Sequence, residues 1–182
     1  MDFSLVFKTL LQKFSEQNIR FALIGGFALH VAGFTRATKD IDFLIMVEDL
    51  SKIKGIMQQL GYELTHESPE FSNYWHPMVP LGSVDYLHAH RTYTRKMLER
   101  AQKQKILENF EAPVLIPEDI IGLKVQSMVN NPLRHSLDMA DIEYLIRNSD
   151  KLNFDIIKEY FHLFALDNEL KEILKRVKNA QR

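Results

Sequence analysis

The sequence predicts an α+β fold, with an α/β half at residues 1–115 followed by a helical half at residues 116–182. Two observations lead to this prediction. Short apolar or alternating runs typical of strands are interspersed with helical periodicity through the first half. Then Pro117, Glu118 and Asp119 open a helix, and only helical patterns follow. Proline suits the first turn of a helix, and acids there favour the positive end of its dipole.

The first half starts with an amphipathic helix, because Val6, Leu10 and Phe14 recur at helical spacing. A buried strand, Phe21–Ile24, then stops at a glycine pair and precedes a short helix at 27–31. The following patterns predict a loop at 33–38, an alternating strand at 40–45 and a helix at 50–60. After these come strands at 62–65, 73–76 and 82–89, a helix at 94–104 and an extended stretch at 106–116. The second half carries helices at 117–129, 136–146, 154–161 and 166–177.

Composition excludes several classes of protein. Hydrophobic residues make up 46% of the chain and charged residues 26%, which is enough apolar side chain for a sizeable core. The net charge of -1 lacks the basic excess of proteins that mainly coat nucleic acid. Without cysteine there is no disulfide scaffold, cysteine-ligated zinc site or thiol nucleophile.

The sequence also predicts a cytoplasmic protein with no membrane partner. Its first residues lack the basic region of a signal peptide. The longest apolar stretch, Phe21–Phe34, contains a glycine pair and is shorter than the roughly 20 residues of a membrane span.

Three aspartates are the candidate catalytic and metal-binding residues. Asp40 and Asp42 share one face of an alternating strand, and Asp85 lies in the middle of a later apolar strand. If these strands are neighbours, the carboxylates meet and can hold Mg²⁺ or Mn²⁺, since a cation relieves the repulsion between them. Three carboxylates can hold two metals roughly 4 Å apart for displacement at phosphorus. The alternative is that Asp40 and Asp42 are ordinary solvated surface.

The glycine pair Gly25-Gly26 has two interpretations. One is a tight turn from strand to helix. The other is a phosphate site, because glycines allow close backbone approach and a helix start offers free N–H groups. The Walker A and GxGxxG motifs are absent, so neither a P-loop nor a Rossmann dinucleotide site is supported.

His88 and His90 alternate on a strand and resemble a metal-binding pair. Asp85 is expected on the opposite face to His88, so a zinc site shared between them is not favoured. A metal-dependent hydrolase would also use clustered carboxylates, but such enzymes usually add histidine motifs that this sequence lacks.

Together these motifs resemble the nucleotidyltransferase superfamily, which has the DNA polymerase β-like fold. Its pattern is an apolar strand, Gly-Gly or Gly-Ser, a short spacer, Asp-hydrophobic-Asp, and a third acid on a later strand. The matching segments are Leu23-Ile24-Gly25-Gly26, Asp40-Ile41-Asp42 and Ser83-Val84-Asp85-Tyr86. The resemblance implies a mixed β-sheet flanked by helices, followed by a helical C-terminal region that packs on this core.

The helical half is more similar to one branch, the AbiEii/MenA-type nucleotidyltransferases. The segments that carry this likeness are Pro117–Lys124, Arg134, Asp138 and Asp141–Glu143. Members of this branch are often toxin-like partners in toxin–antitoxin pairs. The resemblance therefore implies a toxin-like role and a cognate antitoxin as partner.

The resemblance also implies the chemistry. A nucleoside monophosphate moves from a nucleoside triphosphate, such as ATP, to an acceptor, and pyrophosphate leaves. Asp40 and Asp42 would bind both Mg²⁺ ions, while Asp85 would bind the catalytic ion and help to deprotonate the acceptor. Gly25 and Gly26 would contact the β- and γ-phosphates.

Basic and polar residues near the motif add candidates. Arg36, Thr38 and Lys39 are expected to contact the triphosphate, with ordinary surface positions as the alternative.

In the helical half, Lys124 is either a phosphate contact or a lysine whose stem packs on apolar surface. Arg134 and Asp138 are spaced to pair with each other on a helix. Asp138 and Asp141 would orient Lys124 or close the nucleotide pocket.

Two functional hypotheses remain from the sequence. The first is an active Mg²⁺-dependent nucleotidyltransferase whose acceptor is a tRNA, a protein or a small molecule. The second is a catalytically inactive nucleotide- or protein-binding module of the same fold.

Overall fold

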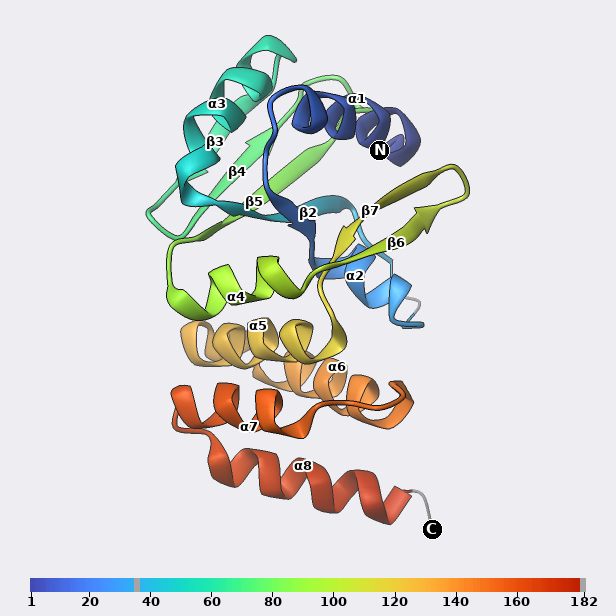
Figure 1. Ribbon diagram of the computed structural model, residues 1–182, viewed down its shortest axis with the longest axis vertical. Coiled ribbons are helices and arrows are strands. Elements are labelled where there is room, and N and C mark those ends of the chain that lie inside the picture. The colour runs from blue at the N-terminus through green and yellow to red at the C-terminus, as the bar shows by residue number, and fades with distance from the viewer. Residues whose placement is uncertain (35–36, 181–182) are drawn as a thin grey trace. The chain divides into compact units, whose positions relative to one another are not determined.

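The chain forms two compact units in a computed structural model that describes residues 1–34 and 37–180 (Figure 1). The first unit contains Met1–Val31 and Thr35–Leu115, and the second contains Ala32–Phe34 and Ile116–Arg182. Each unit is described separately below. None of the described helices is both long enough and apolar enough to cross a membrane.

The first unit is built on one seven-stranded sheet with the order β3-β4-β5-β2-β1-β7-β6. Its strands are β1 (Phe21–Leu23), β2 (Asp40–Met46), β3 (Glu63–Glu67), β4 (Phe71–Trp75), β5 (Ser83–Ala89), β6 (Gln102–Leu107) and β7 (Phe110–Val114). The β2–β5 and β1–β7 pairs are parallel and the other pairs are antiparallel. With its helices α1 (Phe3–Glu16), α2 (Gly25–Val31), α3 (Leu50–Gln59) and α4 (Thr92–Arg100), this mixed sheet confirms the predicted α+β class.

Aromatic side chains form the core between α1 and one face of the sheet. Phe14 of α1 lies 5.3 Å from the ring of Phe43 on β2 and 4.9 Å from that of Phe21 on β1, measured between ring centroids. Phe43 in turn stacks on Tyr86 of β5 at 5.8 Å. Offset and edge-to-face contacts of this kind stabilise a core beyond the burial of apolar area. They fix the direction in which β2 and β5 turn their alternate residues.

The opposite face of β2 changes character along the strand. Asp40 and Asp42 are half-buried, whereas Leu44 and Met46 on the same face are buried. Figure 1 shows α4 on the side of the sheet opposite to α1, and α4 contacts β2 and β5. The alternation predicted for 40–45 therefore holds at the aspartates and ends at Leu44. A polar patch remains at the start of β2.

One predicted helix end is wrong. The sequence predicts helix over 94–104, but α4 ends at Arg100, and Gln102 begins β6. The segment Gln102–Lys105 is polar and suits a helix by propensity, yet it pairs antiparallel with β7. Strand pairing therefore overrides local propensity. The extended stretch predicted at 106–116 becomes the second half of this hairpin.

The second unit is helical. It contains α5 (Pro117–Asn130), a short 3₁₀ turn η2 (Pro132–Arg134), α6 (His135–Asn148), α7 (Phe154–Leu163) and α8 (Asp167–Ala180). The ring of Tyr160 on α7 packs so closely against Gly122 of α5 that a β-carbon at position 122 would not fit. The Tyr160 hydroxyl donates a hydrogen bond to buried Asp119 at 2.6 Å. The ring of Phe34 stacks on Tyr144 of α6 at 4.1 Å, which ties residues 32–34 to this unit.

Candidate active site

Three carboxylates meet at the polar patch of the first unit. Oxygen atoms of Asp40, Asp42 and Asp85 all lie within 4.8 Å of one another, and the three side chains are half-buried. Among the described residues, this is the only group of three or more acidic or histidine side chains whose atoms could share one metal ion. Asp42 and Asp85 are 43 positions apart in the sequence, yet they lie directly beside each other on neighbouring strands.

Strand register explains why they meet. β2 and β5 run parallel, with Asp42 directly beside Asp85 and Asp40 beside Ser83. Paired residues on neighbouring strands point to the same face of a sheet. Because Phe43 and Tyr86 are fixed in the core on the other face, the aspartates must turn toward the polar patch. A slip of one residue would reverse every side chain on the strand, so the core sets the site.

The surroundings of Asp85 disfavour its charged form. Burial raises the pKa of the Asp85 carboxyl above its usual value. A hydrogen bond with the side chain of Asn73 opposes this rise, and the nearby charge of Asp40 adds to it. A carboxylate that is costly to ionise is well suited to accept a proton or to bind a cation.

The glycine turn lies directly against this cluster. Gly25 has a φ of 62°, which favours glycine, and a β-carbon there would overlap the Oδ2 atom of Asp42. The helix α2 begins at Gly25, two residues before the predicted start at Phe27, and is seven residues long. The backbone N–H of Ile24 donates to the carbonyl of Asp42 at 2.9 Å, which joins the turn to β2. Both motifs predicted from the sequence therefore occupy one place.

Thr38 connects the same two elements. Its hydroxyl donates to Oδ1 of Asp40 at 2.7 Å, with a longer contact of 3.2 Å to the backbone carbonyl of Asp40. A β-carbon at Gly26 would come within 2.7 Å of the Thr38 side chain. Thr38 therefore positions a carboxylate in this structure, whereas its predicted phosphate contact stays a prediction. Lys39 is exposed, and Arg36 lies outside the described residues.

The donor set fits a divalent metal. Three carboxylates are the hard oxygen ligands that Mg²⁺ and Mn²⁺ prefer. Their crowding within 4.8 Å on a half-buried face is costly without a cation, as the raised pKa of Asp85 indicates. Backbone at Gly25 and Gly26 lies so close to Asp42 and Thr38 that neither position admits a β-carbon, which brings main-chain groups next to the carboxylate cluster.

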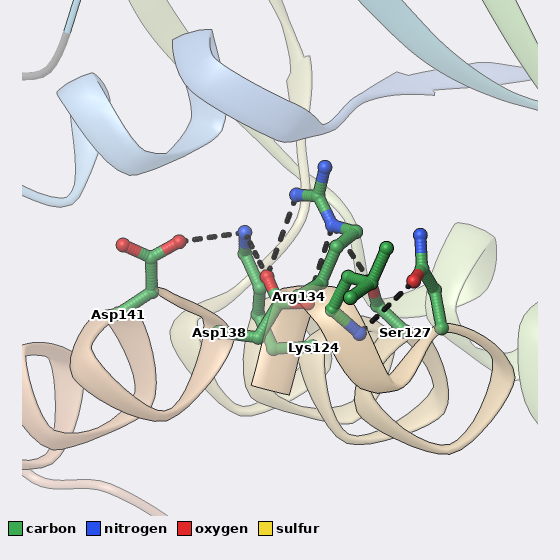
Figure 2. Close-up of polar contacts among 7 residues, drawn as sticks. Lys124, Ser127, Arg134, Asp138 and Asp141 are labelled. Carbon is green, nitrogen blue, oxygen red and sulfur yellow. Dashed lines mark hydrogen bonds and ion pairs between the residues drawn. The ribbon is translucent and has the colours of Figure 1, made fainter. Parts of the chain in front are cut away.

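The residues named in the helical half form a second charged cluster, which Figure 2 shows. The ammonium of Lys124 on α5 lies 2.9 Å from Asp138 and 2.6 Å from Asp141 on α6. Both aspartates are almost fully buried, and Lys124 is 11% exposed. Arg134, 45% exposed, reaches Asp138 at 3.4 Å and Ser127 at 3.2 Å. The predicted pairing of Arg134 with Asp138 is therefore present.

Hydrogen bonds keep Asp138 ionised. Burial alone would raise the pKa of its carboxyl, but hydrogen bonds with Ser127 and Lys124 outweigh burial and lower this pKa below the usual value. The charged state of Asp138 thus belongs to the folded unit, where it orients the Lys124 ammonium.

His88 and His90, which the sequence does not favour as a zinc site, have other polar partners in the structure. His88 is buried, and its ring lies 3.1 Å from both the Ser72 hydroxyl and the Pro69 carbonyl. His90 is exposed, and its ring contacts the His88 carbonyl at 3.1 Å. Burial lowers the pKa of His88, which favours its neutral ring. A neutral ring held between the Ser72 hydroxyl and the Pro69 carbonyl explains the presence of this buried histidine.

Sequence reasoning missed Asn73. It lies on β4 directly opposite Asp85, and its side chain hydrogen-bonds with that carboxylate. A single asparagine in a short polar and aromatic run carries no local pattern that points to a site. Only the pairing of β4 with β5 identifies it as a neighbour of the site.

Comparison with known proteins agrees with this geometry. A family model described as "Uncharacterised nucleotidyltransferase" matches residues 3–179. The chain therefore belongs to this family of nucleotidyltransferases. No curated protein matches the sequence.

Solved structures with the same fold include two of the antibiotic-resistance factor ANT(2'')-Ia. Its solution structure has a TM-score of 0.63 at 13% identity, over 100% of this chain and 98% of that chain. Its crystal structure with adenylyl-2''-tobramycin has a TM-score of 0.62 at 16% identity, over 89% and 95%. Lincomycin-bound LnuA, a lincosamide antibiotic adenylyltransferase, gives 0.50 at 16% identity, over 79% and 96%. These likenesses confirm the nucleotidyltransferase-like fold.

Proposed function

We propose that this nucleotidyltransferase moves a nucleoside monophosphate from a nucleoside triphosphate, such as ATP, to a hydroxyl of an acceptor, with Mg²⁺ or Mn²⁺ as cofactor. The observation that carries the proposal is the meeting of Asp40, Asp42 and Asp85 beside the Gly25 turn. Phosphoryl transfer relies mainly on positioning and charge neutralisation, and these are the two properties that this arrangement supplies.

Each residue has a role in the proposed reaction. The acceptor oxygen forms a bond to the α-phosphorus, and the bond from this phosphorus to the bridging oxygen of pyrophosphate breaks. The hydroxyl proton passes to the Asp85 carboxylate, which acts as the general base. Gly25 and Gly26 would hold the departing phosphates against their backbone. Asp40 and Asp42, with Asp85, would hold the divalent cation, which when bound neutralises charge on the phosphates.

Residues outside the carboxylate cluster have supporting roles in the proposal. Arg36 and Lys39 would neutralise the triphosphate. Lys124 is proposed as a phosphate contact, and Asp138 and Asp141 would orient its ammonium. The two short ion pairs of Lys124 support this positioning role for the aspartates. We also propose a cytoplasmic location, because that is where the nucleoside triphosphate substrate would be used.

The AbiEii/MenA-type relationship and the toxin-like role are finer proposals. They rest on the segments of the helical half named in the sequence, and the cluster of Lys124, Arg134, Asp138 and Asp141 gives those residues a common place. The test is growth of cells that express the chain alone. Arrest that a neighbouring gene relieves would support a toxin with its antitoxin, and unimpaired growth at high expression would reject this role.

The acceptor is proposed from two observations. Two structural neighbours were solved with antibiotic molecules, ANT(2'')-Ia with adenylyl-2''-tobramycin and LnuA with lincomycin. This chain has a net charge of -1, which does not favour a long polyanionic acceptor such as tRNA. A small-molecule hydroxyl is therefore the leading acceptor class, ahead of tRNA or a protein.

The experiment is a transfer assay with each of the four labelled nucleoside triphosphates, Mg²⁺ and three acceptor pools: small molecules, tRNA and cell protein. The wild-type chain should release pyrophosphate and label one pool. Asp42→Asn should abolish transfer and keep the fold, which circular dichroism would check. Asp150→Asn, an exposed aspartate far from β2 in the sequence, is the matched control.

The alternative is a nucleotide- or protein-binding module without turnover. Calorimetry separates the two hypotheses. Binding of nucleoside triphosphate with Mg²⁺, combined with no transfer to any pool, would overturn the catalytic proposal in favour of the binding module.

A further inference from the structure

We propose that strands β3 and β4 carry the acceptor-binding surface, and that this surface takes a cationic, amine-bearing molecule whose reacting hydroxyl is borne by a sugar-like ring. The surface consists of Asn73, Trp75 and Phe71 on β4 with His66 and Glu63 on β3. The inference rests on the proposed function, because it assigns the second substrate of the same site.

Strand order places this surface on the correct side of the carboxylates. The glycine turn follows β1, which lies next to β2, whereas β4 lies next to β5. Along the sheet the order is therefore glycine turn, Asp42, Asp85 and Asn73. An in-line displacement needs the leaving group and the attacking oxygen on opposite sides of phosphorus. With pyrophosphate at the glycine turn, the acceptor must approach from β4.

The residues of this surface share the face of Asp85. Asn73 pairs directly with Asp85, and Trp75 pairs with Ser83, the neighbour of Asp40. Phe71 lies two residues before Asn73 and therefore points the same way. Buried Ser72 and Tyr74 alternate with them on the other face. Trp75 and Phe71 thus lie on either side of Asn73, about 13 Å apart along the strand.

Two of these side chains expose aromatic rings beside the site. Trp75 is 44% exposed and Phe71 is 39% exposed. The Phe71 ring stacks on His66 at 4.8 Å with an interplanar angle of 22°, which holds it in a fixed orientation. Large exposed apolar side chains grouped near an active site usually mark a binding surface. Ring faces of this kind pack against the apolar faces of sugars and attract ammonium groups.

Charge decides between a small molecule and a nucleic acid. Strands β3, β4 and β5 contain neither lysine nor arginine, and Glu63 and Asp85 lie on the face of this surface. Glu67 pairs with Ser72 on the other face, where it forms an ion pair with Lys54. Glu63 pairs with Trp75 and lies on the same face as it. A nucleic-acid surface supplies cations to phosphates along its length. An acidic and aromatic surface instead complements amines, so an amine-bearing sugar is the occupant that this surface fits.

Asn73 links acceptor and base. Its side chain hydrogen-bonds with the Asp85 carboxylate, which fixes that group relative to β4. An acceptor that lies on Trp75 and Phe71 would therefore present its hydroxyl to a positioned carboxylate. Asn73 is a positioning residue in this proposal.

The chain itself offers a direct binding assay, because Trp75 is its only tryptophan. Tobramycin serves as the cationic amino-sugar probe and a ten-nucleotide oligoribonucleotide as the polyanionic probe, without nucleoside triphosphate. We expect saturable change of Trp75 fluorescence with tobramycin and none with the oligoribonucleotide. Phe71→Ala and Glu63→Gln should each weaken tobramycin binding at least about five-fold. Leu64→Ala, an exposed apolar residue that pairs with Tyr74 on the other face, should leave it unchanged.

Steady-state kinetics completes the test. Trp75→Ala should raise the acceptor KM at least about ten-fold and leave the KM for nucleoside triphosphate unchanged, while Trp75→Phe should restore most of the loss. Asn73→Ala should lower kcat more than it raises the acceptor KM. Saturable binding of the oligoribonucleotide in place of tobramycin, no binding of either, or an unchanged acceptor KM in Trp75→Ala would each overturn the proposal.

Failure of this inference is distinguishable from failure of the proposed function. Fluorescence titration reports binding at Trp75 without turnover, whereas slow release of pyrophosphate with water as acceptor reports turnover without this surface. Pyrophosphate release with no effect of the β4 variants would reject the acceptor surface alone.

Discussion

Gly25 lies so close to Asp42 that a β-carbon at position 25 would overlap the Oδ2 carboxylate oxygen. The glycine turn and the strand that carries Asp40 and Asp42 are therefore in direct contact. Any side chain at Gly25 must displace the carboxylate that the proposed reaction needs. This contact explains the glycine by space as well as by its φ of 62°.

Replacing this glycine should damage both stability and the site. Gly25→Ala should lower the free energy of unfolding by about 1–2 kcal/mol, the cost of left-handed backbone for a residue with a β-carbon. It should also abolish the stabilisation that Mg²⁺ gives the wild-type chain. Urea unfolding with and without Mg²⁺ measures both effects.

A second glycine provides the control. Gly55 lies inside α3, and a β-carbon there meets nothing within 4 Å. Gly55→Ala should stabilise the chain by about 0.5–1 kcal/mol and leave transfer unchanged. If both alanine variants kept full Mg²⁺ response, the contact between Gly25 and Asp42 would have no functional importance.

The hydroxyl of Thr38 should tune the site through Asp40. Thr38→Val keeps the shape of the side chain but removes the 2.7 Å hydrogen bond to Oδ1. Partners of metal-binding groups typically contribute about 10–100-fold to metal affinity or activity. We therefore expect the Mg²⁺ concentration needed for half-maximal rate to rise by a factor in that range in Thr38→Val, and to return toward the wild-type value in Thr38→Ser.

Thr9→Val is the matched control, since its hydroxyl bonds only to the Leu5 carbonyl of α1, at 2.9 Å. Equal Mg²⁺ dependence in Thr38→Val and Thr9→Val would contradict a positioning role for Thr38.

The carboxylate pair could be predicted because the core dictates it. Ile41, Phe43 and Ile45 are apolar at alternate positions of β2, so the sequence itself shows which way Asp40 and Asp42 turn. The same holds for Asp85 between Val84 and Tyr86. Local patterns of this kind carry the direction of a side chain, although they do not carry the identity of the neighbouring strand.

Residues whose importance comes from pairing between strands could not be predicted. Asn73 and Trp75 are meaningful only through the register of β4 on β5, which no local pattern contains. The helix predicted over 94–104 extends into the polar run at Gln102–Lys105 for the same reason. The strand that pairs with this run, β7, lies further along the chain. Long-range pairing is the information that propensity and periodicity leave out.

Asp85 should make the metal-free protein less stable at neutral pH. Burial raises its pKa in the folded state above the unfolded value of about 3.9. Below the unfolded pKa the carboxyl is protonated in both states, and as the pH rises through the folded pKa the native state must ionise it at a cost. In EDTA, Asp85→Asn should therefore unfold at a higher urea concentration than wild type at pH 7.

The difference between these two proteins should shrink as the pH falls from the folded pKa of Asp85 toward about 3.9, and it should be absent below that value. Added Mg²⁺ should stabilise wild type and not Asp85→Asn, because a ligand that binds only the native state raises stability. A metal-free wild-type chain more stable than Asp85→Asn at pH 7 would contradict the strained carboxylate.

Lys124 should be a main determinant of stability in the helical unit. Its ammonium lies between the buried Asp138 and Asp141, and removing one partner of a buried ion pair typically costs about 3–5 kcal/mol. Lys124→Met keeps the length of the side chain but leaves two buried carboxylates without that cation. We expect a loss in this range in urea unfolding. Arg134→Met, whose side chain is 45% exposed, should cost under about 1 kcal/mol.

A compensating change tests the cause. Because the loss comes from uncompensated charge, adding Asp141→Asn to Lys124→Met should recover part of it, although Asp141→Asn alone should destabilise the chain. Losses that simply add in the double variant would show that Lys124 acts through packing of its stem, and the ion pairs with Asp138 and Asp141 would then not be the source of the stability.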